Sequence, residues 1–92
     1  MPKPSRVTRS RFEYEEDGMV AFLEFETDDV GWITILRTEV PEPLRGRGVA
    51  GELLRTAFQY AKERQLRVDV LCPLAAGYLK RHPELRGSSS NG

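Results

Sequence analysis

The spacing of the hydrophobic residues changes once along this chain, near its middle, and this change limits the folds that the chain can adopt. In the first half hydrophobic residues fall on every second position, and from Gly48 onward they recur about every four residues. A period of two is typical of a β-strand with one buried face, and a period near 3.6 is typical of an α-helix. Because 92 residues are too few for two separate hydrophobic cores, strands and helices must share one core. We therefore expect one small domain of the α/β (α+β) class.

Three antiparallel strands are predicted for the first half. Asp17 with Gly18, and Asp28 with Gly31, are turn-forming residues that divide this half into three segments. Within each segment apolar and polar residues alternate, so that one face of each strand is apolar. The strands are predicted around Phe12 and Tyr14, at Met19–Thr27 and at Trp32–Val40.

A long helix is the clearest element of the second half. Between Gly48 and Arg64 the apolar residues lie on one helical face and the polar residues on the other. A short strand is predicted at Leu66–Val70, where alternation returns, and a final helix at Leu74–Arg81. The order is then β-β-β-α-β-α, from which we expect a mostly antiparallel sheet without a parallel β-α-β unit.

The two ends of the chain lack core-forming residues. Residues 1–6 include two prolines, and residues 87–92 are rich in serine and glycine, which is typical of flexible termini. The single ordered domain is accordingly predicted at residues 7–86.

Composition excludes several classes of function. The 14 basic and 14 acidic side chains give a net charge of zero, so no overall field attracts nucleic acid. The apolar runs are far shorter than the roughly 20 residues that cross a bilayer, and no signal-peptide region is visible, so we expect a cytoplasmic location. The only cysteine, Cys72, and the only histidine, His82, cannot by themselves form a zinc site.

The segment from Arg45 to Ala50 joins the predicted third strand to the long helix and is the main candidate for a binding site. The first N–H groups of a helix lack partners within the helix, and the helix dipole adds positive charge, so such a turn suits phosphate. Gly46 and Gly48 let a pyrophosphate approach the backbone, and Arg45 and Arg47 can add charge. The alternative is a tight turn that binds nothing. No Walker Gly-Lys-Ser or Gly-Lys-Thr follows, and a dinucleotide fingerprint would need the parallel β-α-β unit.

Read from Arg45, this segment resembles the Arg/Gln-x-x-Gly-x-Gly/Ala signature of the GNAT acyltransferase superfamily, whose members bind the coenzyme A pyrophosphate there. The chain is also similar, over residues 11–85, to a small single-domain N-acetyltransferase-like family within it. The residues that carry this similarity are Thr38–Pro41, Arg45–Ala50, Cys72 and Tyr78–Pro83. Two positions depart from the pattern, because Arg37 stands where histidine is common and Val70 where proline is common.

The resemblance implies acetyl-CoA, a thioester of coenzyme A, as co-substrate and an amine as acceptor. It implies that the pyrophosphate lies on Arg45, Gly46, Arg47, Gly48, Val49 and Ala50, and that backbone groups of Glu39 and Val40 bind the pantetheine arm. Lys80 and Arg81, at the end of the last predicted helix, could meet the coenzyme's phosphates, but they also suit the helix dipole without any ligand.

Acyl transfer from a thioester requires a neutral amine and a protonated or stabilised thiolate. Glu39 could accept the amine's proton if partial burial raises its pKa from about 4.3. The alternative is an exposed carboxylate at a strand end. Tyr78 lies near where larger relatives commonly carry a tyrosine general acid and could protonate the thiolate. The alternative is an aromatic side chain that packs against the sheet.

Cys72 lies at a strand-to-helix junction, where helix amides could lower its pKa from about 8.5 and favour a covalent acyl intermediate. No base is identifiable for it, because His82 is ten residues further on. The alternative is a small buried cysteine. Because the resemblance includes this position, Cys72 ranks first among the catalytic candidates, followed by Glu39 and Tyr78.

Two functions fit the sequence. The first is a minimal N-acetyltransferase that acts on an unidentified amine, and the second is a non-catalytic acyl-CoA-binding or sensing module. A nucleic-acid binder is disfavoured by the zero net charge and by the lack of a basic and aromatic stripe. Larger relatives have additional N-terminal helices that help to wall the acceptor site, so the acceptor here is expected to be large or to be completed by a partner, such as a protein substrate. The oligomeric state is left open.

Overall fold

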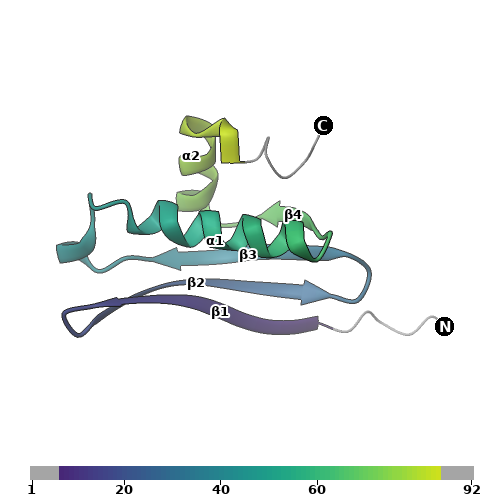
Figure 1. Ribbon diagram of the computed structural model, residues 1–92, viewed down its shortest axis with the longest axis horizontal. Helices are drawn as coiled ribbons and strands as arrows, with labels where there is room; N and C mark the ends of the chain where they lie inside the picture. The colour runs from purple at the N-terminus through teal and green to yellow at the C-terminus, as the bar shows by residue number, and fades with distance from the viewer. Residues whose placement is uncertain (1–6, 86–92) are drawn as a thin grey trace.

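The computed structural model describes residues 7–85, so the predicted flexible ends, residues 1–6 and 87–92, lie outside the described residues. Figure 1 shows a four-stranded sheet with one helix, α1, lying across it and a second, α2, standing beside β3 and β4. The elements are β1 (Val7–Glu16), β2 (Met19–Asp28), β3 (Trp32–Glu39), the 3-10 helix η1 (Glu42–Leu44), α1 (Val49–Glu63), β4 (Arg67–Val70) and α2 (Pro73–Arg81). Every element whose bounds were predicted begins and ends within one residue of them. None of the helices in residues 7–85 has the length and hydrophobicity to cross a membrane.

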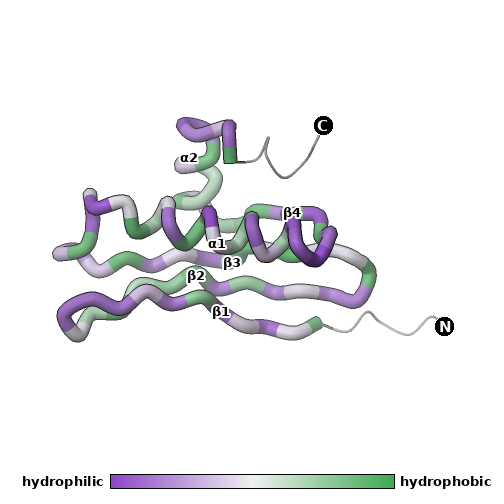
Figure 2. Tube along the Cα trace, viewed as in Figure 1, coloured by the Kyte–Doolittle hydropathy of each residue, from purple (hydrophilic) through white to green (hydrophobic). Residues whose placement is uncertain are grey.

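One hydrophobic core lies between the sheet and the helices. In β2 every second residue is buried, at Ala21, Leu23 and Phe25, and Figure 2 shows hydrophobic and hydrophilic residues alternating along the strands. β3 adds Ile33 and Ile35, both completely buried. The helices contribute Val49, Leu53, Leu54, Ala57, Phe58 and Ala61 from α1 and Ala75 and Leu79 from α2. Burial of each large side chain stabilises the fold by about 1.5–3 kcal/mol, so this shared core holds both layers together.

The direction of β4 corrects one expectation. The pairs β1–β2 and β2–β3 are antiparallel as predicted, but β4 pairs with β3 in parallel, with Ile33 opposite Val68 and Ile35 opposite Val70. The expectation that this order provides no parallel β-α-β unit is therefore wrong. The physical reason is that α1, with 15 residues, runs back along the sheet and returns the chain to the end at which β3 began.

β3 contains an irregularity at Leu36. The pairing of β2 with β3 shifts by one residue there, which is the pattern of a β-bulge. As a result Thr38 is buried like Ile35, whereas Arg37 is exposed. Pairing with β4 ends at Ile35, so in the described residues the β4 side of β3 is open from Leu36 to its end. The two parallel strands thus part at this point.

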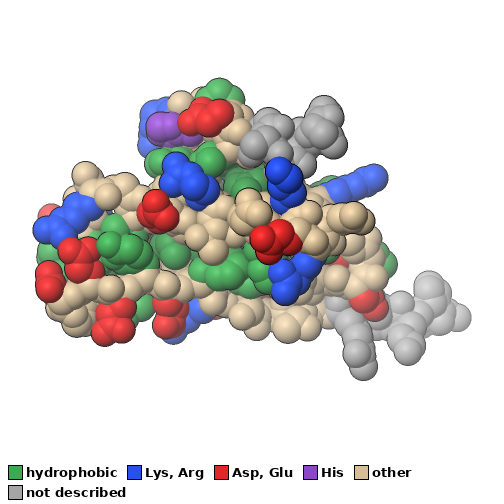
Figure 3. All heavy atoms as spheres, in the orientation of Figure 1, with side chains coloured by type: hydrophobic (Ala, Val, Ile, Leu, Met, Phe, Trp, Pro, Cys, Tyr) green, Lys and Arg blue, Asp and Glu red, His purple; other side chains and the backbone are tan. Residues whose placement is uncertain are grey.

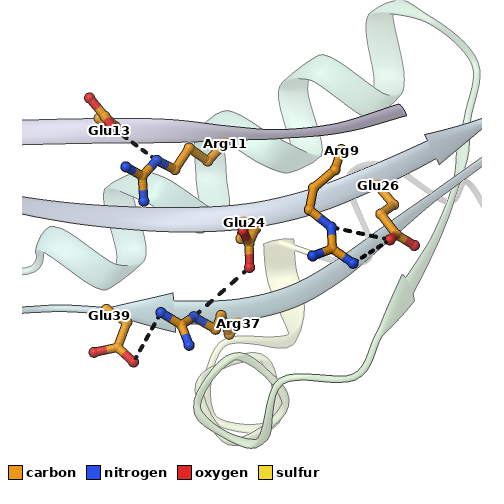
Figure 4. A network of polar contacts seen from close by, with 7 residues as sticks. All are labelled: Arg9, Arg11, Glu13, Glu24, Glu26, Arg37 and Glu39. Atoms are coloured by element: carbon orange, nitrogen blue, oxygen red, sulfur yellow. Dashed lines mark hydrogen bonds and ion pairs between the residues drawn. The ribbon is translucent and has the colours of Figure 1, made fainter. Parts of the chain in front are cut away.

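The sheet face turned away from α1 carries a network of charged side chains (Figure 4). Its members are Arg9, Arg11, Glu13, Glu24, Glu26, Arg37 and Glu39. The guanidinium carbons of Arg11 and Arg37 lie 4.4 and 5.3 Å from the centre of the Phe22 ring. Exposed ion pairs contribute little to stability, and two members of the network, Arg11 and Arg37, cover the Phe22 ring with charged groups.

Candidate functional site

A groove of about 380 Å³ lies where the end of β3, the start of α1 and the side of α2 meet. The groove is lined by Val40, Leu44, Arg45, Gly46, Gly48, Val49, Ala50, Gly51, Leu74, Tyr78 and Arg81. It therefore brings together most of the residues predicted to bind the coenzyme with one predicted catalytic residue, Tyr78. Three predicted site residues, Glu39, Arg47 and Cys72, are not among the residues that line it.

The backbone of the loop before α1 has the geometry that an anion site needs. Gly46 and Gly48 both have left-handed backbone angles, with φ of 82° and 80°, a region that side-chain-bearing residues rarely adopt. A Cβ at either position would meet no atom within 4 Å, so the space above the loop is open. The first backbone hydrogen bond of α1 runs from the Glu52 N–H to the Gly48 carbonyl at 3.0 Å. The preceding amides of α1 have no partner inside the helix and remain available to a ligand.

The two arginines of the loop are held differently. Arg45 donates a hydrogen bond from Nε to the Val40 carbonyl at 3.0 Å and also lines the groove. Arg47 instead donates to the Glu16 carboxylate at 2.7 Å, an ion pair that ties the loop to the end of β1. Arg45 is thus positioned beside the candidate pyrophosphate site, whereas Arg47 does not line the groove and links the loop to β1 through its ion pair with Glu16.

The same carboxylate holds a tyrosine on β1. The Tyr14 hydroxyl donates to Glu16 at 3.0 Å. This hydrogen bond, with the negative charge of Glu16 and some burial, raises the pKa of Tyr14 above its ordinary value, and the charge of Arg47 acts against the rise. Tyr14, Glu16 and Arg47 therefore form one polar link between the β1–β2 hairpin and the loop.

Tyr78 packs on the first turn of α1 and against the shared hydrophobic core. A Cβ built at Gly51 would collide with the Tyr78 hydroxyl and would lie 2.8 Å from its Cζ, so the ring rests on the bare backbone of that glycine. On its other side the ring stacks on His82 at 4.3 Å. The phenol is consequently held inside the groove, close to the helix start, where a departing group could meet it.

Gly51 also completes a Gly46-x-Gly48-x-x-Gly51 spacing within the parallel β-α-β unit, the spacing of a dinucleotide fingerprint. In that fingerprint the first glycine follows directly on the strand. Here six residues, including η1, separate the end of β3 from Gly46. The strand-to-loop connection therefore differs from that of a dinucleotide site.

Cys72 is closed in at the other end of α2. It is 3% exposed and is the N-cap residue of that helix, but its side chain forms no capping hydrogen bond with the helix amides. His82 is the C-cap residue of the same nine-residue helix, ten residues further on and roughly 15 Å away along the axis. The structure thus separates the only cysteine from the only histidine.

Glu39 and Thr38, neighbours at the end of β3, have opposite environments. The Glu39 side chain is 57% exposed and its carboxylate lies 3.9 Å from Arg37, so the partial burial that its proposed role as a base requires is not present. Thr38 is only 7% exposed, and in the described residues its hydroxyl has no hydrogen-bond partner. A buried hydroxyl without a hydrogen-bond partner lowers the stability of the fold, and this one lies in the part of β3 that does not pair with β4.

Sequence analysis did not identify Gly51, Leu74 or Thr38 as site residues. Glycine inside a helix costs about 1 kcal/mol relative to alanine, so Gly51 was a signal that something packs closely on that turn. Leu74 gave no such signal, because its position depends on how α2 docks, and the burial of Thr38, a residue of the family resemblance, depends on the bulge in β3.

Comparison with known proteins gives a family match over most of the chain. A family model described as GCN5-related N-acetyl-transferase matches residues 11–87. Protein NATD1 of Bos taurus is 35% identical over 51 residues, which are 55% of this chain and 45% of that protein. The NATD1 proteins of Xenopus tropicalis and Homo sapiens are each 33% identical over 51 residues, or 47% and 45% of their lengths. The chain thus spans less than half the length of these relatives. No solved structure is significantly similar to it.

Proposed function

Because this chain belongs to the GCN5-related N-acetyltransferase family, we propose that it transfers an acetyl group from acetyl-CoA to an amine. The observation that carries the proposal is the groove that joins the unpaired amides at the start of α1 to the open end of β3. Domains of this family generally use acetyl-CoA as co-substrate, and a coenzyme with a pyrophosphate and a long arm needs both parts of such a groove.

The residues around the groove have distinct binding roles in this proposal. Amides of the Gly46–Ala50 segment and the Arg45 guanidinium bind the pyrophosphate. The pantetheine arm lies along the open edge of β3 and bonds to backbone groups of Glu39 and Val40, in the manner of an added strand. Apolar side chains of Leu44 and Leu74 flank the arm and exclude water.

In the reaction the amine nitrogen attacks the thioester carbonyl carbon, a C–N bond forms, and the C–S bond breaks. The amine gives up a proton and the departing sulfur gains one. Tyr78, which lines the groove, protonates the sulfur. Glu39 is the proposed acceptor of the amine's proton, and because its side chain is exposed and does not line the groove, the transfer has to run through water. This direct route is supported better than a covalent route through Cys72, which is buried and does not line the groove.

A second candidate, an acyl-CoA-binding module without catalysis, is favoured by one observation. The candidate base, Glu39, is 57% exposed and no described residue other than Arg37 forms an ion pair with it, so its carboxylate is not organised as a general base. Such a module would bind the coenzyme in the same groove and would not release free thiol.

Coenzyme A binding tests both candidates. A ligand that binds only the folded chain raises its stability by about 2.7 kcal/mol at a hundredfold excess over the dissociation constant, which a thermal unfolding assay detects. Gly48→Ala should abolish this shift. Gly18→Ala is the matched control, because Gly18 has nearly the same φ, 78° against 80°, with equally open space, but lies outside the groove. Absence of a shift in the unmodified chain would contradict both candidates.

Turnover separates the candidates. With acetyl-CoA and a panel of amines, an enzyme releases free thiol, whereas a binding module does not. Tyr78→Phe should slow release on the order of 10²–10⁴-fold if Tyr78 is the general acid. Cys72→Ser should retain activity on the direct route, so a complete loss of turnover in that variant would favour the covalent one.

A further inference from the structure

The outer edge of β1 pairs with no strand in residues 7–85. β1 is the first strand in the sheet order, so its backbone is bonded on the β2 side alone. Its 10 residues extend over roughly 34 Å. Figure 1 shows the strand, in purple, along one margin of the sheet. An unpaired edge of this length is a template for a further strand.

The charged residues of β1 are ordered by sign. On the face turned away from α1, Arg9 and Arg11 are followed by Glu13 and Glu15. Arg11 Nε and Glu13 Oε2 lie 3.0 Å apart, and the two side chains are 47% and 51% exposed. The first half of this face is therefore basic and the second half acidic, within reach of an incoming strand.

This order of charges is complementary to itself when the strand direction is reversed. When two copies of β1 lie antiparallel with Phe12 opposite Phe12, Arg11 of one copy faces Glu13 of the other, and Arg9 faces Glu15. Each contact occurs twice, because the arrangement has two-fold symmetry. Opposite charges directly across neighbouring strands stabilise a sheet and like charges destabilise it.

Other registers are disfavoured. A shift by two residues in either direction places Arg11 opposite Arg11 or Glu13 opposite Glu13. A shift by one residue places the charged face of one strand beside the aromatic face of the other, since side chains alternate along a strand. The charges of β1 therefore select the register centred on Phe12.

A second observation comes from the α1 side of the same strand. A groove of about 410 Å³ runs between β1 and α1, lined by Phe12, Glu52, Arg55, Thr56, Gln59, Tyr60 and Glu63. Figure 3 shows hydrophobic side chains in the strip between these two elements, with charged side chains on either side. The Phe12 ring stacks on Phe25 at 4.7 Å and meets Tyr60 edge-on at 5.5 Å. The register above brings the second copy's Phe12 to this groove.

We propose that the chain forms a symmetric homodimer in which two β1 strands pair antiparallel about Phe12 and join the two sheets into one. The occupant of the edge is a second copy, because the charges of β1 match those of another β1 in one register. Among residues 7–85 none lines both this groove and the coenzyme groove, so pairing through β1 does not use the coenzyme groove. The dimer does not depend on acetyl transfer.

Sedimentation velocity on the full chain, from micromolar to millimolar concentration, tests the proposal. The unmodified chain is expected to sediment as a dimer. Arg11→Glu and Glu13→Arg are each expected to be monomeric at the same concentrations, because each places like charges opposite one another twice. Lys80→Glu is the control for a change of net charge, since Lys80 is exposed on α2 far along the chain from β1, and it should still dimerise.

An equimolar mixture of the two variants gives the decisive measurement. The introduced glutamate of one copy then faces the introduced arginine of the other, and the native Glu13 faces the native Arg11, so the mixture should dimerise. Neither variant regains the Arg11–Glu13 pair within its own chain, so recovery cannot come from repair of the monomer.

Three results would overturn the proposal: a monomer at every concentration, single variants that dimerise as well as the unmodified chain, or a mixture that stays monomeric. Circular dichroism verifies that each variant is folded. Capture of a foreign extended peptide by a monomeric chain would show that the edge binds another partner, and would also contradict the dimer.

Discussion

At the scale of single residues, the Thr38 hydroxyl stands out because it is a buried polar group without a hydrogen-bond partner in the described residues. It lies at the end of β3, where the strand does not pair with β4. An unsatisfied buried polar group costs about 1–3 kcal/mol. A ligand that reaches this part of β3 would supply the missing partner.

Thr38→Val should therefore raise the free energy of unfolding by about 1 kcal/mol and at the same time weaken stabilisation by coenzyme A. Urea titration with and without the coenzyme measures both effects. Thr34→Val, on the opposite face of the same strand, should change stability by less than about 0.5 kcal/mol. A less stable Thr38→Val variant would mean that the hydroxyl is satisfied in the free protein.

Gly51 allows a second prediction at this scale. In most helices Gly→Ala stabilises by about 1 kcal/mol, but here the added Cβ collides with the Tyr78 hydroxyl. Gly51→Ala should instead destabilise by about 1–3 kcal/mol, the usual cost of overpacking. In a Tyr78→Ala background the same substitution should stabilise by about 1 kcal/mol. Equal effects in the two backgrounds would show that the ring moves aside at no cost.

At the scale of elements, the β1–β2 hairpin and the loop before α1 are linked through Glu16. The Tyr14 phenol has a raised pKa because it donates to this carboxylate. Its folded-state pKa lies above the unfolded value of about 10. The stability it contributes is thus complete below pH about 10 and is lost as the pH rises through the folded pKa.

Tyr14→Phe should accordingly lower the thermal unfolding midpoint at neutral pH, and the gap between the two proteins should narrow at strongly alkaline pH. Unfolding scans over a series of pH values measure the gap. A gap that stays constant with pH would show that the hydrogen bond to Glu16 does not control it.

Sequence periodicity predicted the four strands, the two α-helices and the bounds of all of these but β1, whereas it did not predict η1, the parallel direction of β4 or the bulge in β3. The alternation in Met19–Thr27 and the four-residue spacing after Gly48 reflect burial on one face, which is a local property. The parallel direction of β4 depends on the length and path of α1 across the sheet. The bulge at Leu36 depends on pairing with β2, so neither could be read from the residues of one segment.

The candidate site also has one part that the sequence predicted and one part that it did not. The loop at Arg45–Ala50 was predictable because helix-start amides and glycines act locally, and the structure gives Gly46 and Gly48 the left-handed angles that only glycine adopts freely. The placement of Tyr78 inside the groove and of Cys72 outside it arises from the docking of α2, which no local pattern encodes. The roles of the predicted site residues remain predictions.

At the scale of the whole molecule, one core supports both the sheet and the groove. Leu54 of α1 is completely buried in this core. Leu54→Ala should lower the free energy of unfolding by about 2–5 kcal/mol, a large part of the about 5–15 kcal/mol of a small domain. Helical circular dichroism and the fluorescence of Trp32, the single tryptophan, should shift together, because both layers unfold as one unit. Val30→Ala, at a 65% exposed residue, is the control.

The extra residue in β3 decides which chemistry faces inward. With strict alternation, positions 37 and 39 would follow Ile33 and Ile35 under α1, and the interior would have to accommodate a guanidinium and a carboxylate. The extra residue, Leu36, shifts the alternation of the following residues by one position. The side chains of Arg37 and Glu39 are therefore exposed to water, and the Thr38 hydroxyl faces inward. Before the bulge the inward-facing residues of β3 are apolar and build the core. After it the inward-facing residue is Thr38, a polar residue beside the strand edge that β4 does not pair with.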